Sequence, residues 1–189
     1  MHPLMKDQAF IRSAADHLEA YLLSNELYWQ MTPAKQDRGV GNLISLTPGN
    51  LMISLIKIKH FPWREAEQTT FEPLLKRVDD EISKWRSAWR KKVERELNAR
   101  LKQWQDYLAE VGTDDALVDY SFKVRNRAIL DCFDPRDVSL TPAQNSLLFL
   151  LDDRLKRLTV TGGFVWEPEV EGGFKPDVFW YLYRQPGKG

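Results

Sequence analysis

The chain has 189 residues, of which 43% are hydrophobic and 29% are charged. This is ordinary globular usage, and it excludes a disordered chain. Lys plus Arg number 27 and Asp plus Glu number 27, so the net charge is zero, which excludes a globally basic nucleic-acid coat protein and an acidic tail protein. The length corresponds to one large domain, and we predict a single domain over residues 1–189.

Cysteine usage and the N-terminal residues indicate the cellular compartment. Cys132 is the single cysteine, so the chain forms no intrachain disulfide, and one thiol is too few for a cysteine-based zinc site. The residues before Asp7 contain no apolar run of signal-peptide length. No later segment reaches the roughly 18 uninterrupted apolar residues of a membrane span. We therefore expect a soluble, cytoplasmic protein without membrane contacts.

The first 60 residues contain one clear helix signal and one ambiguous segment. Apolar residues from Phe10 to Trp29 recur at three- and four-residue steps, which predicts a helix that ends near Gln30. Pro and Gly residues make 32–50 a loop. Thr47-Pro48 is typical of a helix start, with an N-cap residue before a proline at the first helical position. Because 50–60 is rich in isoleucine, both helix and strand remain open there.

Residues 71–111 carry the most regular pattern of the chain. Their apolar residues are spaced 3.6 residues apart on average, and no Gly or Pro follows Pro73 in this range. A left-handed coiled coil would need a spacing of about 3.5 residues. We therefore predict one nearly straight central helix of about 40 residues, about 60 Å long, packed on its own domain.

Two shorter helices are predicted after the central one. Tyr120, Val124, Ala128 and Cys132 are four residues apart, which predicts a helix over 119–133 with Asp119 as its cap. Thr141-Pro142 repeats the helix-start signal and predicts a helix over 142–157. The buried face expected for that helix consists of Leu147, Leu148, Leu151 and Leu155.

The last thirty residues change character, with Gly and Pro residues between short aromatic runs. Phe164–Trp166 and Val178–Tyr183 are predicted to be the two strands of an antiparallel hairpin. The predicted fold class is therefore mainly α, of the α+β kind. It has a helical part over 1–157 around the central helix, and a small C-terminal β-hairpin, the aromatic ribbon of 158–185, packed on it.

The aromatic ribbon is the first candidate interface. Side chains of neighbouring strand residues point to opposite faces, so one of Trp180 and Tyr181 should face away from the helices. An open aromatic face is too large for a monomer to leave bare, which favours a protein partner or self-association. The candidate interface residues are Trp166, Trp180, Tyr181 and Tyr183.

A row of cations on the central helix is the second candidate. Placed 100° apart per residue, Lys84, Lys91, Arg95 and Lys102 fall within about 20° of each other. Such a row could follow a phosphate backbone. Opposite charges four residues away favour an ordinary solvated face instead. The candidate anion-binding or nucleic-acid face consists of Lys84, Lys91, Lys92, Arg95 and Lys102.

Residues of like charge are grouped in blocks along the second half of the chain. Basic residues cluster near Arg127 and near Arg157, and acidic residues such as Asp131 and Asp152 flank them. Such blocks of both signs suit docking within the molecule or a complementary partner surface, and they occur equally by chance in highly charged helices.

Catalytic and cofactor motifs are absent from the sequence. The three histidines have no ligand spacing, and Cys132 lies on the apolar face of its predicted helix, as an inert buried thiol does. We therefore predict no metal, no cofactor and no enzymatic activity, although a site assembled only by tertiary contacts leaves no local trace. The favoured function is a non-enzymatic protein–protein interaction or scaffold protein, with a nucleic-acid-binding accessory protein as the alternative.

Overall fold

The computed structural model describes residues 4–111 and 119–187, and it is mostly helical with a small two-stranded antiparallel sheet near the C-terminus. The chain divides into two compact units, Met1–Glu96 and Leu97–Gly189. We describe each unit by itself.

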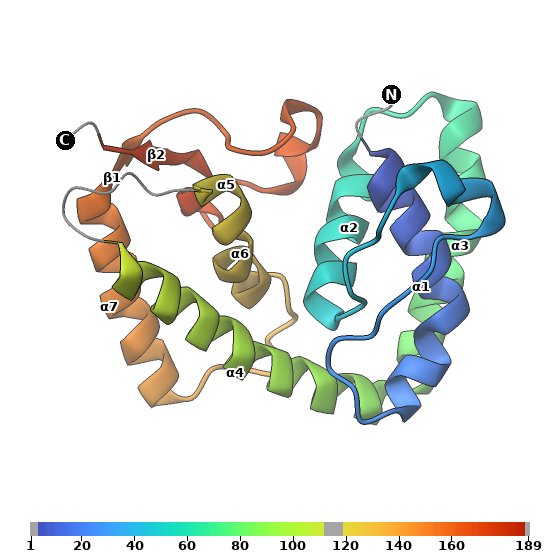
Figure 1. The fold of residues 1–189 in the computed structure, drawn as a ribbon, viewed down its shortest axis with the longest axis horizontal. Helices are drawn as coiled ribbons and strands as arrows, with labels where there is room; N and C mark the ends of the chain where they lie inside the picture. Colours follow the sequence, from blue (N-terminus) through green and yellow to red (C-terminus); the bar gives the residue numbers. More distant parts are fainter. Residues whose placement is uncertain (1–3, 112–118, 188–189) are drawn as a thin grey trace. The chain divides into compact units, whose positions relative to one another are not determined.

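Unit 1 consists of helices packed on α1 (Met5–Leu23). It also contains the short 3-10 helix η1 (Lys35–Val40), α2 (Pro48–His60), α3 (Glu65–Lys84) and the first part of α4 (Arg86–Glu110). Helices α2 and α3 both pack against α1 (Figure 1). The apolar residues that fill this core include Phe10, Leu18, Leu51, Ile58 and Val78, all essentially inaccessible to solvent.

The helix start at Thr47 is confirmed, and it resolves the ambiguous segment as a helix. Thr47 Oγ1 accepts a hydrogen bond from the backbone N–H of Asn50 at 3.1 Å, and Pro48 begins α2. A second acceptor comes from α4, because the buried carboxylate of Glu96 accepts from the N–H of Gly49 at 2.6 Å. Two of the N–H groups at the α2 N-terminus thereby have acceptors, and the isoleucines of 50–60 lie on a helix.

The predicted helix over 10–30 ends earlier than expected. Helix α1 ends at Leu23, and the Ser24 backbone and hydroxyl both donate to the carbonyl of Tyr21. Trp29 then forms an isolated antiparallel bridge with Leu46. Trp29 is half-buried in this extended segment, so the last step of the apolar spacing does not belong to a longer helix.

The prediction of one central helix of about 40 residues is wrong. The chain turns at Trp85, which separates α3 from α4, and the longer of the two, α4, has 25 residues (Figure 1). Backbone hydrogen bonds from Trp85 to Glu81 and from Trp89 to Trp85 span the turn, so the apolar spacing stays in phase across it. Beside the turn, Lys84 pairs with Glu19 on α1, and Arg95 donates to the carbonyl of Asn25, which follows α1.

Unit 2 consists of the rest of α4, three further helices and the small sheet. The helices are α5 (Tyr120–Lys123), α6 (Arg125–Asp131) and α7 (Pro142–Leu158). Strand β1 (Thr159–Thr161) pairs antiparallel with β2 (Arg184–Pro186), with Val160 opposite Gln185. The 3-10 helices η2 (Pro168–Gly173) and η3 (Trp180–Tyr183) lie between the strands in the chain. The core includes Trp104, Leu155, Phe174 and Tyr181.

Two of the predicted elements in unit 2 are placed differently. The helix expected over 119–133 is divided at Val124 into α5 and α6, and Asp119 adopts a left-handed conformation (φ 56°) without a side-chain cap hydrogen bond. The strands of the sheet are 159–161 and 184–186, outside the aromatic runs that were predicted to form them. Phe164–Trp166 is irregular, and the rings of Phe164 and Trp166 pack on Phe174 instead of alternating across a ribbon. Trp180–Tyr183 is a 3-10 helix.

Helix α7 confirms the second helix-start signal. Thr141 Oγ1 accepts from the N–H of Gln144 at 3.3 Å, and Gln144 Oε1 accepts from the N–H of Thr141 at 2.8 Å, a complete capping box. Leu148, Leu151 and Leu155 form its buried face, as predicted, while Leu147 is half-buried.

Replacing Thr141 with alanine is expected to lower the free energy of unfolding by about 1 kcal/mol, because the N–H of Gln144 loses its acceptor. Thr141→Ser keeps a hydroxyl at the same position and is expected to retain most of the stability. Urea denaturation of both variants measures the difference. Equal stability of the alanine and serine variants would show that the cap contributes nothing.

Candidate functional site

Two of the three most exposed large apolar side chains of the described residues lie next to each other on α7. Phe149 is 73% exposed and Leu150 is 62% exposed. Together with Asn145 and Ser146, they border a shallow, open hollow of about 450 Å³. We call these four residues the α7 face. The opposite side of the same helix holds its buried leucines, so the α7 face points away from the core of unit 2.

Charged and polar groups flank the α7 face at both ends of the helix. One turn toward the C-terminus, Asp153 and Arg157 form an ion pair with an N–O distance of 2.6 Å. Toward the N-terminus, the amide of Gln144 donates to Asn98 Oδ1 at 2.6 Å. The face is therefore an apolar centre with polar ends.

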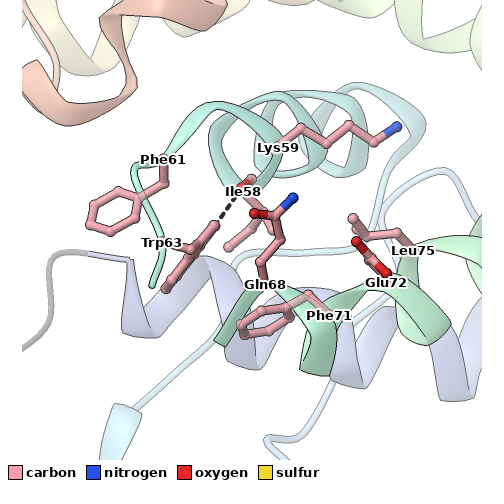
Figure 2. A pocket seen from close by; sticks show the side chains of 8 residues that line it. All are labelled: Ile58, Lys59, Phe61, Trp63, Gln68, Phe71, Glu72 and Leu75. Carbon is pink, nitrogen blue, oxygen red and sulfur yellow. Dashed lines mark hydrogen bonds between the residues drawn. The ribbon is translucent and has the colours of Figure 1, made fainter. Parts of the chain in front are cut away.

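A pocket in unit 1 lies between the end of α2 and the beginning of α3 (Figure 2). We call it the α2–α3 pocket, and its volume is about 140 Å³. Its apolar lining comes from Ile58, Phe61, Trp63, Phe71 and Leu75. Figure 2 shows Phe61 and Trp63 toward one end of the pocket and Leu75 toward the other.

The aromatic wall of the α2–α3 pocket is held in place. Trp63 Nε1 donates to the carbonyl of Ile58 at 2.7 Å, which fixes the indole. Its ring centroid lies 4.5 Å from that of Phe61 and 5.2 Å from that of Phe71. The three rings thus support one another, as in aromatic clusters of protein cores.

Three polar side chains complete the lining of the α2–α3 pocket. Lys59 comes from α2, and Gln68 and Glu72 come from α3. All three residues are exposed. The two opposite charges are thus carried by different helices beside a cavity with mixed apolar and polar lining.

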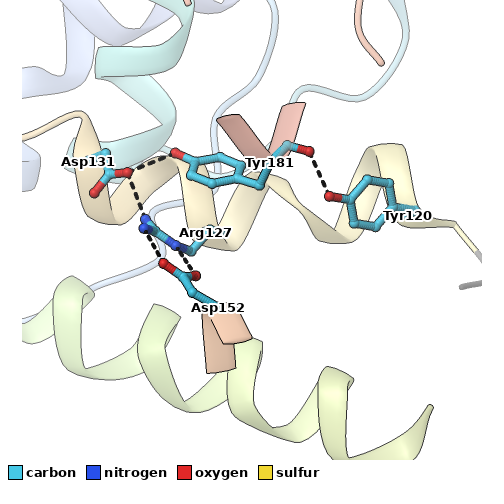
Figure 3. Close-up of polar contacts among 5 residues, drawn as sticks. All are labelled: Tyr120, Arg127, Asp131, Asp152 and Tyr181. Atoms are coloured by element: carbon cyan, nitrogen blue, oxygen red, sulfur yellow. Dashed lines mark hydrogen bonds and ion pairs between the residues drawn. The ribbon is translucent and has the colours of Figure 1, made fainter. Parts of the chain in front are cut away.

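A buried ion-pair network organises unit 2 (Figure 3). Arg127 on α6 binds both carboxylate oxygens of Asp152 on α7, at 2.8 and 3.0 Å, and it donates to Asp131 at 2.7 Å. The hydroxyl of Tyr181 donates to the same Asp131 oxygen at 3.0 Å, and the guanidinium lies 4.5 Å from the centroid of the Tyr181 ring. The hydroxyl of Tyr120 donates to the carbonyl of Tyr181 at 2.6 Å.

Burial sets the electrostatics of this network. Burial raises the pKa of Asp131, and Arg127 and the Tyr181 hydroxyl only partly offset that rise. Burial also raises the pKa of Tyr181, and the Asp131 charge adds to it. For Arg127, burial alone would lower the pKa, but the hydrogen bonds to Asp152 and the neighbouring charges outweigh it and raise the pKa. The network therefore holds a permanent cation between two carboxylates.

The network shows that some residues of the charge blocks, namely Arg127, Asp131 and Asp152, pair with one another within the molecule. It joins α6, α7 and η3, three segments of unit 2 that are distant in sequence. Arg127 and Tyr181 are buried and the Asp131 and Asp152 side chains are mostly covered, so the charges of this network are taken up by one another. We therefore assign a structural role to this network.

The structure places the candidate basic face in several different environments. Lys84 pairs with Glu19 at 2.8 Å, and Lys102 pairs with Asp106 at 2.8 Å. Arg95 donates to the carbonyl of Asn25 at 2.8 Å. Lys91 is exposed and makes no hydrogen bond or ion pair with any residue that the structure describes.

Lys92, the fifth of these cations, is buried. Its ammonium donates to the carbonyl of Glu26 and to Ser24 Oγ, and it lies 4.4 Å from the centroid of the Tyr21 ring. Burial lowers the pKa of Lys92, and the neighbouring Arg95 lowers it further. Lys92 therefore fastens the segment after α1 to α4 within unit 1.

The four candidate interface aromatics are partly or fully covered within unit 2. Tyr181 is fully buried, while Trp166, Trp180 and Tyr183 are half-buried. The indole of Trp166 donates to the carbonyl of Ser121 at 2.8 Å, and Tyr183 donates to that of Phe174 at 2.8 Å. The expectation that strand alternation turns Trp180 or Tyr181 outward is wrong, because both lie on the 3-10 helix η3. Their role in an interface stays a prediction.

Sequence reasoning missed both the α7 face and the α2–α3 pocket. Phe149 and Leu150 interrupt the leucine pattern of 147–155, and two adjacent apolar residues off the buried stripe were the available signal. The pocket left no such signal, because its lining comes from two helices and from the loop between them.

The described residues show no metal site. No three His, Cys, Asp or Glu side chains among them gather closely enough to hold an ion. Cys132 is half-buried at the end of α6. None of the described helices is both long and apolar enough to span a bilayer.

Comparison with known proteins gives no relative for this chain. No family model matches it, and neither a curated protein nor a solved structure is significantly similar.

Proposed function

We propose that this protein is a non-enzymatic interaction protein and that two copies bind each other through the α7 face. The observation that supports this proposal is the exposure of Phe149 and Leu150 side by side on a helix whose leucine face is buried. Exposed apolar surface is costly in water, and a contiguous patch of it is typical of an interface.

The order of side chains along α7 favours a second copy as the partner. In an antiparallel, two-fold arrangement centred on Phe149, the apolar residues of the two copies meet each other. Position 145 of one copy is then opposite position 153 of the other, so Asn145 lies across from the Asp153–Arg157 pair. An amide next to a carboxylate and a guanidinium finds hydrogen-bond partners for both of its groups. The α7 face is therefore complementary to itself.

Replacing Phe149 and Leu150 with glutamate is expected to abolish self-association, because four carboxylates would then meet at the centre of the contact. Light scattering after size-exclusion chromatography, from micromolar to millimolar protein, measures the change in mass. Leu23→Glu is the matched control, since Leu23 is an equally exposed leucine on α1, and it should leave association unchanged.

Two outcomes would contradict this proposal. A wild-type protein that stays monomeric at the highest concentration has no self-complementary face. If the double glutamate variant still associates, the contact uses another surface, and the candidate interface aromatics Trp166, Trp180 and Tyr183 are tested next. Salt-dependent binding of nucleic acid that is lost when Lys84, Lys91 and Arg95 become glutamate would favour the alternative function instead.

A further inference from the structure

We propose that the α2–α3 pocket binds a free hydrophobic α-amino acid, with its side chain in the cavity and its charged groups at the rim. This site is separate from the α7 face, and the inference does not depend on self-association. Its support comes from the size of the cavity, the fixed aromatic wall and the two opposite charges beside it.

The size of the cavity matches one ring or one branched alkyl group. Apolar cavities of about 150 Å³ hold a benzene-sized molecule. The α2–α3 pocket has about 140 Å³, and its lining residues Ile58 and Phe71 are buried. A phenylalanine or leucine side chain therefore fits, and a two-ring ligand does not.

The aromatic wall is already in its binding position. Trp63 is held by its hydrogen bond to Ile58 and by ring contacts on two sides, with Phe61 and Phe71. A ligand that enters such a preformed site does not have to order the side chains that receive it, which would otherwise reduce its affinity. A ring that enters the cavity can add to the same cluster of aromatic contacts.

The rim selects the charge of the ligand. Neither Lys59 nor Glu72 forms an ion pair or a side-chain hydrogen bond with any of the described residues, so both charges are available. A ligand with a single charge would be attracted by one of them and repelled by the other. A zwitterion places its carboxylate at Lys59 and its ammonium at Glu72, and the Gln68 amide can bind to either group.

Titration of the full chain with L-phenylalanine tests this proposal, with the indole N–H signal of Trp63 followed by NMR. Phenylalaninamide lacks the carboxylate, and N-acetylphenylalanine lacks the ammonium. Each analogue is expected to bind about tenfold or more weakly than L-phenylalanine, since each loses one charge-assisted hydrogen bond. L-Leucine should bind in the same way as L-phenylalanine, and L-aspartate should not bind.

Two variants connect each charge of the ligand to one residue of the rim. In Lys59→Met, phenylalanine and its amide should bind equally weakly, and in Glu72→Gln the same should hold for phenylalanine and its N-acetyl form. Lys6→Met removes an exposed lysine from α1 and should leave all affinities unchanged. Because Lys59 and Glu72 are exposed, neither variant should disturb folding, which the remaining NMR signals verify.

The proposal is overturned by either of two results. If L-phenylalanine does not shift the Trp63 signal at millimolar concentration, the pocket does not bind amino acids. If benzyl alcohol, which has the ring but no charge, binds as tightly as L-phenylalanine, the rim has no part in recognition and the pocket is only an apolar cavity.

Discussion

Replacing Arg127 with methionine is expected to lower the free energy of unfolding by about 3–5 kcal/mol, because it leaves two largely buried carboxylates without their cation. Arg127 is 5% exposed and forms three hydrogen bonds to Asp131 and Asp152. Methionine fills much of the volume of the aliphatic part of arginine. The loss of stability therefore comes from the missing charge and not from a new cavity. Chemical denaturation monitored by circular dichroism measures it.

The loss of stability in Arg127→Met should become smaller as the pH falls. Arg127 lowers the pKa of Asp131 in the folded protein, so its removal raises that pKa further above the value in the unfolded chain. A carboxyl with a raised pKa binds more protons in the folded state than in the unfolded state, and this stabilises the folded state as the pH falls. The difference between Arg127→Met and wild type should therefore shrink from neutral to mildly acidic pH.

Arg136→Met is the matched control for this prediction. Arg136 also pairs with an aspartate, Asp134, but its side chain is 87% exposed. Water replaces the lost partner at such a site, so we expect little change in stability and no change in its pH dependence. If both arginine variants lose the same stability, burial of the network does not matter and its assignment to structure is wrong.

Local signals in the sequence predicted the helix starts but not the turn at Trp85. Thr47-Pro48 and Thr141-Pro142 act through hydrogen bonds within one turn, so the residues present suffice to predict them. The turn at Trp85 has no glycine or proline at the break, and α3 and α4 contact the end of α1 on either side of it. An apolar spacing of 3.6 residues continues through such a turn and cannot reveal it.

The aromatic C-terminal segment shows how packing overrides strand propensity. Aromatic residues favour strands because they fit a pleated, half-buried surface, and this led to the predicted strands over 164–166 and 178–183. In the structure, Phe164, Trp166 and Phe179 all lie within 6.1 Å of the Phe174 ring, between centroids. A compact ring cluster of this kind buries more of each side chain than a two-stranded ribbon could.

The candidate sites depended on tertiary structure even more strongly. The charge blocks indicated intramolecular docking, but only the fold shows that Arg127 selects Asp131 and Asp152 among the acidic residues. The row of cations assumed one straight helix, whereas Lys84 ends α3 and Lys92 is buried against Tyr21. A helical projection gives the direction of a side chain but not what lies opposite it.

Replacing Trp104 with alanine is expected to lower the free energy of unfolding by about 3–5 kcal/mol, as for other large buried side chains. Trp104 on α4 is fully buried, and its ring lies 5.6 Å from that of Tyr107, between centroids. Phe122→Ala, which removes a ring that is 68% exposed on α5, should change stability little. Thermal and urea unfolding of both variants test this difference.

Trp104→Phe separates the two contributions of this side chain. The indole Nε1 of Trp104 is buried without a hydrogen-bond partner among the described residues. Such a donor costs about 1–3 kcal/mol in the folded state, and phenylalanine removes it together with part of the ring. The two effects oppose each other, so Trp104→Phe should lose less than about 1.5 kcal/mol, far less than the alanine variant. If phenylalanine is as damaging as alanine, the indole N–H stabilises the fold, and Trp104 is held by more than the packing of its ring.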